Sequence, residues 1–313
     1  MRQIAILSGK GGTGKTTVAA ALAHLASQEA SIVLADADVD AANLELVLSP
    51  QILEESEFTG GGVAVIDPEL CIACDACAEV CRFEAIVPGD ETYAVDEIGC
   101  EGCAACIYVC PVEAIEMQER MDGRWFRSQA RYGPLFHAHL FAARENSGKL
   151  VTLVKSRARL AAMEENADYL LVDGPPGIGC PVIAAISGAD LTLLVTEPTV
   201  AGAHDLERIV GMARHFGIQA VVCINKYDLN LAKTEEIASW CAERDVPVVG
   251  RIPFDQAVTR AMVQGKPITE HSDGPVPEEL QRIWARLKAV FGENDRRAFY
   301  DVELEGGESD ASF

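Results

Sequence analysis

The chain has 313 residues, of which 49% are apolar, so it is long enough for one large α/β domain or two smaller domains. Its net charge of −22 makes nucleic acids and anionic lipid surfaces unfavourable partners, because both are negatively charged. No stretch approaches the roughly 18 continuous apolar residues of a membrane span, and the N-terminal apolar run is too short for a signal peptide. We therefore expect a cytoplasmic protein that binds neither a nucleic acid nor a membrane.

Five short apolar runs are spread along the chain, and helical patterns lie between them. The runs cover residues 3–7, 31–35, 169–173, 191–196 and 220–225. Strands that alternate with helices imply a mostly parallel sheet that is covered on both faces. The expected fold class is therefore α/β, with a doubly wound sheet.

A glycine-rich loop joins the first run to the first helical pattern. Its residues fit the sequence G-x-x-x-x-G-K-[ST] of a phosphate-binding P-loop, in which backbone N–H groups and a helix N-terminus face the phosphates. Lys15 is expected to bridge the β and γ phosphates, and Thr16 to ligate Mg²⁺. The expected nucleotide contacts in this loop are Gly9, Lys10, Gly11, Gly12, Thr13, Gly14, Lys15, Thr16 and Thr17.

Aspartates follow two of the predicted strands. Asp36 and Asp38 follow the second run, and Asp173 ends the third. The carboxyl ends of parallel strands open onto the ligand crevice of such a sheet, so these carboxylates predict a Mg²⁺ site, direct or through water. Helix capping is the alternative for any one of them.

At this point the chain resembles a known family. The stretch KGGTGKTT (10–17) is similar to the deviant Walker A motif of the MinD/ParA class of P-loop ATPases, as are LADADVDAANLEL, LLVDGPPGIG and GRIPFDQAVTRAMVQGKPI elsewhere. The resemblance covers the chain except for a cysteine-rich insert and the tail. It implies a dimeric ATPase with ATP or ADP and Mg²⁺ as ligands.

The resemblance also implies roles for single residues. Lys10 matches the lysine that reaches across the dimer to the partner's nucleotide, where it would stabilise charge on the transferred phosphate. Lys15 matches the phosphate-binding lysine, and Asp38 matches the residue that orients the attacking water. Asp36 matches a neighbour of the metal, and Asp173 matches the Walker B aspartate.

The same resemblance implies which residues contact the base of the nucleotide. Asn225 matches the asparagine that contacts the base, and the turn IPFD (252–255), with Pro253 and Asp255, packs beside it. The stretch NKYD (225–228) also fits the guanine-binding N-K-x-D pattern of GTPases. The rest of the family pattern favours ATP over GTP.

Eight of the eleven cysteines form an internal repeat. CIACDACAEVCRFEAI and CEGCAACIYVCPVEAI start at residues 71 and 100, and each carries C-x-x-C-x-x-C-x-x-x-C, the pattern of bacterial two-cluster ferredoxins. In that pattern the fourth cysteine of each repeat ligates the other cluster, and zinc or disulfides fit the spacing less well. The expected [4Fe–4S] ligands are Cys71, Cys74, Cys77 and Cys110 for one cluster and Cys100, Cys103, Cys106 and Cys81 for the other.

The cysteine block interrupts the alternation of strands and helices and resembles an inserted small α+β bacterial ferredoxin-like domain. Residues 59–62 (TGGG) are interpreted as a flexible joint before it, and residues 117–133 as an irregular return segment after it. The predicted division is a P-loop ATPase core (1–58 and 119–300), the insert (59–118) and a disordered acidic tail (301–313).

The motifs together predict an iron–sulfur ATPase in which nucleotide state controls electron transfer or metal-cofactor assembly. Its partners would be a second copy or a similar subunit, bound through the P-loop face, and an unidentified redox or metal-cofactor protein. One alternative is an iron–sulfur cluster carrier or scaffold. Another is a positioning ATPase like MinD and ParA, ranked last because the acidic tail offers no amphipathic helix or basic patch.

Several further residues carry weaker signals. Cys180 follows Asp173 closely and is interpreted as a buried or interface thiol, and Cys223 and Cys241 as core residues. His137 and His139 could bind a metal, but such a pair normally needs further ligands, so packing is the favoured interpretation.

Overall fold

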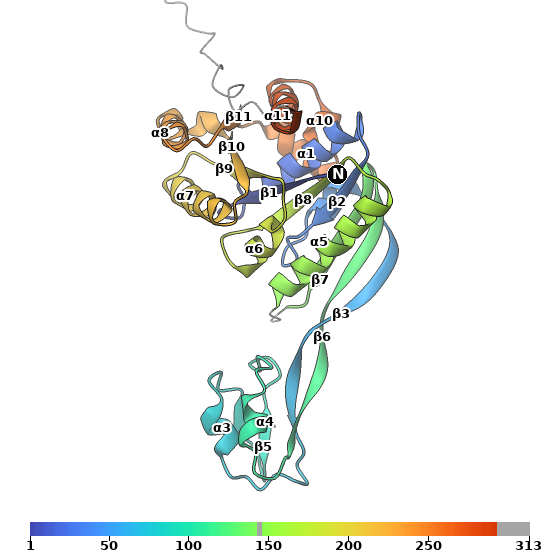
Figure 1. Ribbon diagram of the computed structural model, residues 1–313, viewed down its shortest axis with the longest axis vertical. Coiled ribbons are helices and arrows are strands. Elements are labelled where there is room, and N and C mark those ends of the chain that lie inside the picture. The colour runs from blue at the N-terminus through green and yellow to red at the C-terminus, as the bar shows by residue number, and fades with distance from the viewer. Residues whose placement is uncertain (143–145, 293–313) are drawn as a thin grey trace, which may run out of the picture.

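The computed structural model describes residues 1–142 and 146–292, which contain a nine-stranded sheet in the order β11-β10-β9-β1-β8-β2-β7-β6-β3 (Figure 1). Seven strands from β11 to β7 are parallel, and β6 and β3 add to one edge by antiparallel pairing. The strands are β1 (Arg2–Ser8), β2 (Ile32–Asp36), β3 (Gln51–Ile66), β6 (Ile115–Ala130), β7 (Gly133–Leu140), β8 (Tyr169–Pro176), β9 (Leu191–Thr196), β10 (Gln219–Asn225) and β11 (Val248–Ile252).

Helices cover both faces of this sheet, because its central strands are apolar on both sides. In β1, for example, Ile4 and Ile6 join one core cluster and Leu7 joins the other. One face is covered by α1 (Lys15–Ser27), α2 (Leu44–Leu48), α9 (Gln256–Val263), α10 (Ile268–His271) and α11 (Pro275–Gly292). The other is covered by α5 (Ser147–Glu164), α6 (Cys180–Ile186), α7 (Val200–His215) and α8 (Leu231–Ala242).

The α/β architecture and the mostly parallel sheet confirm the prediction from sequence. All five apolar runs are strands of the sheet, and the bounds of each strand lie within three residues of the predicted ones. The predicted acidic tail, 301–313, lies outside the described residues. Within residues 1–142 and 146–292, no helix has both the length and the apolar character needed to cross a membrane.

Strands β3 and β6 form a long two-stranded ribbon that leaves the sheet, and this was not predicted. Each strand has 16 residues, and their pairing runs from Gln51 opposite Gln129 to Ile66 opposite Ile115 (Figure 1). The prediction of an irregular segment over 117–133 is therefore wrong. Much of the ribbon has solvent on both faces, so its residues lack the alternation of apolar and polar side chains that marks a half-buried strand.

The glycines at 60–62 lie inside β3, so the prediction of a flexible joint there is also wrong. A Cβ on Gly60 would lie 2.7 Å from a side-chain oxygen of Asp122, and a Cβ on Gly62 would lie 3.0 Å from the Gln118 carbonyl oxygen. The Gly62 carbonyl oxygen in turn would lie 2.4 Å from a Cβ on Gly102. These glycines therefore permit close backbone packing.

The ribbon carries residues 67–114, which we call the distal segment, at its far end (Figure 1). It contains α3 (Ala76–Val80), β4 (Ile86–Pro88), β5 (Tyr93–Val95) and α4 (Ala105–Val109). A small apolar cluster joins the distal segment to the ribbon ends and is separate from the two clusters of the sheet. The break between distal segment and ribbon falls at Ile66 and Ile115, inside the predicted bounds of 59–118.

We predict that the distal segment can be removed without unfolding the rest of the chain. Replacing residues 67–114 by Asn-Gly would join the paired residues Ile66 and Ile115 through a two-residue hairpin turn, the type that Asn-Gly favours. The melting temperature should change by no more than about 4 °C, because the sheet and its helices have their own apolar clusters. Circular dichroism and thermal unfolding measure this, and an aggregated or unfolded product would contradict it.

Candidate functional site

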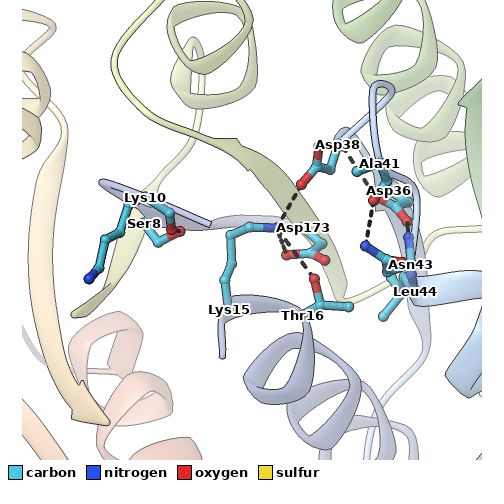
Figure 2. Close-up of polar contacts among 10 residues, drawn as sticks. All are labelled: Ser8, Lys10, Lys15, Thr16, Asp36, Asp38, Ala41, Asn43, Leu44 and Asp173. Atoms are coloured by element: carbon cyan, nitrogen blue, oxygen red, sulfur yellow. Dashed lines mark hydrogen bonds and ion pairs between the residues drawn. The ribbon is translucent and has the colours of Figure 1, made fainter. Parts of the chain in front are cut away.

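The P-loop lies between β1 and α1, at the carboxyl ends of the central strands (Figure 2). Gly12 and Gly14 have φ angles of 81° and 92°, which non-glycine residues rarely adopt. Gly14 also lies against Asn225, whose side-chain amide donates a hydrogen bond of 2.7 Å to the Thr13 carbonyl oxygen. This hydrogen bond from Asn225 of β10 thus stabilises the loop, and α1 begins directly after the loop, at Lys15.

Lys15 lies buried among carboxylates at the strand ends. Its Nζ is 2.7 Å from Oδ1 of Asp173 and 3.8 Å from Oδ2 of Asp38, and Figure 2 shows both contacts together with one to Thr16. Burial alone would lower the pKa of Lys15, but the charge and hydrogen bond of Asp173, together with Asp36 and Asp38, raise it above its ordinary value. Lys15 therefore keeps its positive charge.

Asp36 and Asp38 add negative charge to the same place. Burial, reinforced by the Asp173 carboxylate, raises the pKa of Asp36, and burial raises the pKa of Asp38 to about 6. Asp36 and Asp173 lie opposite each other in β2 and β8. One lysine thus faces three carboxyl groups, and the raised pKa values of Asp36 and Asp38 mean that the charged forms of these two are disfavoured there unless a further positive charge, such as a divalent cation, is bound.

The donor atoms also fit Mg²⁺. Oδ2 of Asp173 is buried and has no hydrogen-bond partner among the described residues. The Thr16 hydroxyl lies beside Lys15, 3.5 Å from its Nζ. Oxygen ligands of this kind, with water completing the shell, are those that Mg²⁺ prefers. Asp36 has a further role, because it accepts backbone hydrogen bonds from Asp38 and, at 3.2 and 3.0 Å, from Asn43 and Leu44.

A cleft of about 740 Å³ extends from the P-loop to the turn at 252–255, and its volume suits a nucleotide. Asn225, Pro253 and Asp255 all line it, as the resemblance implied. The Asp255 side chain also caps α9, because it accepts the Ala257 N–H at 2.7 Å. Phe254, from the same turn, also lines the cleft, and other side chains in its wall were not predicted: Asp40, Leu46, Lys226, Thr259 and Met262.

The position of Asp228 bears on the choice between ATP and GTP. Its Oδ1 accepts a hydrogen bond of 2.7 Å from the Phe254 backbone N–H, so this carboxylate holds the 252–255 turn. In the guanine-binding pattern the corresponding aspartate accepts hydrogen bonds from the base instead. The sequence NKYD therefore serves the packing of the turn here, in agreement with the expectation of ATP.

Two P-loop residues expected to contact nucleotide lie apart from the cleft of their own chain. Lys10 forms an ion pair with Glu197, and its side chain points away from Lys15 (Figure 2). A Cβ on Gly9 would lie 2.1 Å from the Cβ of Asp205, so Gly9 is required where α7 approaches the loop. The close approach of α7 accounts for Gly9 without any contact to phosphate.

The eight cysteines of the repeat gather around two small cavities in the distal segment. All are free thiols, and Cys77 and Cys106 are buried. Each cavity is lined by three cysteines of one repeat and the fourth cysteine of the other. One has Cys71, Cys74, Cys77 and Cys110 in its wall, and the other has Cys81, Cys100, Cys103 and Cys106.

The backbone of the distal segment repeats as its sequence does. The helices α3 and α4 start at Ala76 and Ala105, and positive φ angles recur at matched positions: Ala73 and Gly102, Asp75 and Ala104, Glu84 and Glu113. Left-handed backbone at alanine or aspartate is unfavourable by roughly 1–2 kcal/mol per residue. The two cysteine loops are therefore held in a strained form, which is common around bound groups.

The other three cysteines lie outside these cavities. Cys223 and Cys241 are buried in the two apolar clusters of the sheet, so the prediction of core residues is confirmed. Cys180 is exposed at the start of α6, so it is not a buried thiol.

The fold and the site define the chain as a P-loop nucleotide-binding protein. The sequence profile of the CobQ/CobB/MinD/ParA nucleotide binding domain matches residues 4–268. An uncharacterized protein of Methanocaldococcus jannaschii is 33% identical over 286 residues, covering 91% of this chain and 96% of that protein. The septum site-determining protein MinD of Synechocystis is 23% identical over 294 residues, covering 92% of this chain and 89% of that protein.

A solved structure has the same fold. The septum site-determining protein MinD of Pyrococcus horikoshii, complexed with Mg-ADP, aligns with a TM-score of 0.57 at 18% identity and covers 93% of this chain and 97% of its own. The chain therefore belongs to the CobQ/CobB/MinD/ParA nucleotide-binding family. It is a P-loop ATPase, as the sequence predicted.

We predict that Lys15→Ala abolishes ATP hydrolysis and weakens binding of a non-hydrolysable ATP analogue roughly 10- to 100-fold, because a hydrogen bond from a charged group contributes about 1.5–3 kcal/mol. Calorimetric titration and a phosphate-release assay measure both effects. Lys266→Ala, at a half-buried lysine outside the cleft wall, is the matched control. Unchanged affinity in folded Lys15→Ala protein would show that the cleft binds nucleotide in another way.

Proposed function

We propose that this ATPase carries two [4Fe–4S] clusters in its distal segment and couples their state to the bound nucleotide. The observation that carries the proposal is the division of the eight cysteines into two sets of four, each drawn from both repeats. Four thiolates are the usual ligands of such a cluster. When bound, each cluster would supply one-electron transfer.

The surroundings of the cysteines support the same proposal. Apolar side chains such as Ile66, Ile72 and Ile115 line the first cavity beside the thiols, and Phe83 and Ile86 line the second. Such neighbours keep water away from a bound group and so influence its reduction potential. The Ala114 N–H donates a hydrogen bond of 3.3 Å to Sγ of Cys110, a contact of the kind that also tunes cluster potentials.

A continuous path of structure connects the nucleotide site with the distal segment. Asp36 accepts a hydrogen bond from the N–H of Leu44 at the start of α2, and only two residues separate the end of α2 from the start of β3. Lys149 of α5 also donates a hydrogen bond of 2.8 Å to the Gly60 carbonyl oxygen. A change at Asp38 on ATP binding or hydrolysis would thus act directly on the base of the ribbon.

We further propose that the protein acts in the cytoplasm as a homodimer, or with a similar subunit, and that Lys10 reaches the nucleotide of the partner. The position of Lys10 outside the cleft of its own chain supports this. One of the solved structures with a similar fold is a complex of MinC with MinD. It concerns other proteins, and it supports here only the expectation that proteins with this fold bind partner proteins. An unidentified redox or metal-cofactor protein would be the second partner.

A positioning ATPase is the second candidate function. The comparisons support it better than the iron–sulfur proposal, because the relatives whose names state a role are septum site-determining proteins. That function gives no account of the two cysteine sets. The apolar residues of α11, such as Leu280 and Ile283, are buried in the core, so this helix does not offer a free apolar face to a membrane.

We expect two substitutions to remove one cluster each. Protein purified without oxygen should contain about eight iron atoms per chain, and about four in Cys110→Ser or Cys81→Ser. Electron paramagnetic resonance should then show loss of a different cluster signal in each variant. Cys180→Ser, outside both sets, is the control and should keep all the iron. Iron and sulfide near zero in the unsubstituted protein would exclude the proposal.

Coupling to nucleotide needs its own measurement. Cluster potentials and the rate of reduction of an artificial acceptor should differ between samples with ATP, with ADP and with neither. Equal values in all three, with clusters present, would leave an iron–sulfur protein without redox coupling, and transfer of clusters to an apo-acceptor would then favour a carrier or scaffold. Sedimentation with liposomes or DNA that depends on ATP would favour the positioning ATPase.

We predict that Lys10→Ala retains nucleotide binding but loses most of its ATP hydrolysis, unlike Lys15→Ala. A residue that acts only across a dimer adds little to the affinity of one chain, whereas charge supplied in trans contributes roughly 10³- to 10⁵-fold to turnover in related phosphate chemistry. Calorimetric titration and phosphate release measure the two effects. Lys226→Ala, in the cleft wall, is a comparison that should weaken binding. Unchanged hydrolysis in Lys10→Ala would contradict the role.

A further inference from the structure

Three side chains that are distant in the sequence meet beside the base of the ribbon. Glu45 comes from α2, and His137 and His139 come from β7. Oε2 of Glu45 is 3.0 Å from Nδ1 of His137, and Oε1 is 3.1 Å from Nε2 of His139. From the sequence alone, packing was the favoured interpretation of the two histidines, because no further ligand was evident. The structure places Glu45 beside them as that further ligand.

The orientation of His137 suits a metal ligand. Its ring is buried and lies stacked on Phe126, with ring centroids 5.0 Å apart. Nε2 lies 2.9 Å from the hydroxyl of buried Ser128, while Nδ1 is buried and lacks an aligned hydrogen-bond partner among the described residues. A histidine whose other nitrogen donates to a fixed oxygen is the usual arrangement of a metal-bound imidazole.

The spacing of the donor atoms also suits a metal. One ligand atom from each residue lies within 4.8 Å of the other two. Bonds of 2.0–2.2 Å in a tetrahedral zinc site place ligand atoms about 3.3 Å apart, so small side-chain movements would suffice. Two imidazoles and a carboxylate suit zinc and similar ions, whereas Ca²⁺ would need six to eight oxygen ligands.

We propose that Glu45, His137 and His139 form a binding site for a divalent transition metal of the zinc class. His137 anchors the site from the core, and Ser128 fixes its ring. The His139 side chain is 46% exposed, so metal can enter from solvent, and water can complete the coordination shell. This proposal does not depend on iron–sulfur clusters in the distal segment.

The position of the site gives the metal a role in linking elements. Glu45 directly follows Leu44, whose N–H is held by Asp36 at the nucleotide site. A metal would therefore pin α2 to β7, beside the start of the ribbon. It would restrict the segment between Asp38 and β3, through which we propose that the nucleotide state is transmitted.

Zinc titration of the full-length chain tests the proposal. Equilibrium dialysis against Zn²⁺ should show one more bound equivalent in the unsubstituted protein than in His139→Ala or Glu45→Gln. Zinc X-ray absorption should assign that equivalent to nitrogen and oxygen ligands at about 2.0–2.1 Å, not to sulfur at about 2.3 Å. This distance separates the site from zinc bound by the cysteines.

Two further variants keep the test decisive. Ser128→Ala should weaken zinc binding at this site roughly 10- to 100-fold, because loss of a residue that orients a ligand has that effect. His204→Ala removes an exposed histidine on α7 and should change nothing. Equal zinc content in all variants, or zinc bound only by sulfur, would show that Glu45 makes only polar contacts with the two histidines and holds no metal.

Discussion

The buried contact between Lys15 and the carboxylates at the ends of β2 and β8 is the constraint around which this molecule is organised. One buried ammonium cannot neutralise the carboxylates of Asp36, Asp38 and Asp173 together, and the raised pKa values of Asp36 and Asp38 mean that both groups favour protonation unless further cations or hydrogen bonds are close. Backbone N–H groups supply part of the compensation at Asp36. Mg²⁺ with a nucleotide would supply the rest, so the charge arrangement and the ATPase chemistry have the same origin.

The hydrogen bonds of Asp36 also determine what the nucleotide can influence. Because they hold Asn43 and Leu44, the start of α2 is tied to the strand end that faces the metal. Glu45 and the ribbon follow within a few residues. One short stretch of chain thus connects the nucleotide site, the proposed zinc site and the distal segment. A movement at one of them can reach the others through this stretch alone.

The parts of the fold that were predictable are those specified by local patterns. Apolar runs identified the central strands, and fixed spacings identified the P-loop and the sets of cysteines. The ribbon was not predictable, because consecutive glycines in a sequence usually indicate a flexible loop. Here glycines 60–62 are needed for close contacts with Asp122 and Gln118 in the other strand, and the sequence does not show those contacts. Glu45 was missed for a similar reason, because its histidine partners lie more than 90 residues away and only the pairing of β2 with β7 brings them close.

The ribbon explains how a small segment far from the sheet could respond to the nucleotide. An isolated two-stranded hairpin is marginally stable, so it transmits movement only if contacts hold it both to the sheet and to the distal segment. Lys149 fixes the ribbon near the sheet through the Gly60 carbonyl oxygen. Arg120, which pairs with Gly61 directly beside this contact, donates hydrogen bonds to the Glu97 and Cys100 carbonyl oxygens, and Gly102 of the distal segment packs on Gly62. A rotation at the base would therefore turn the distal segment as a unit, whereas the flexible joint suggested by the glycines would absorb the same rotation.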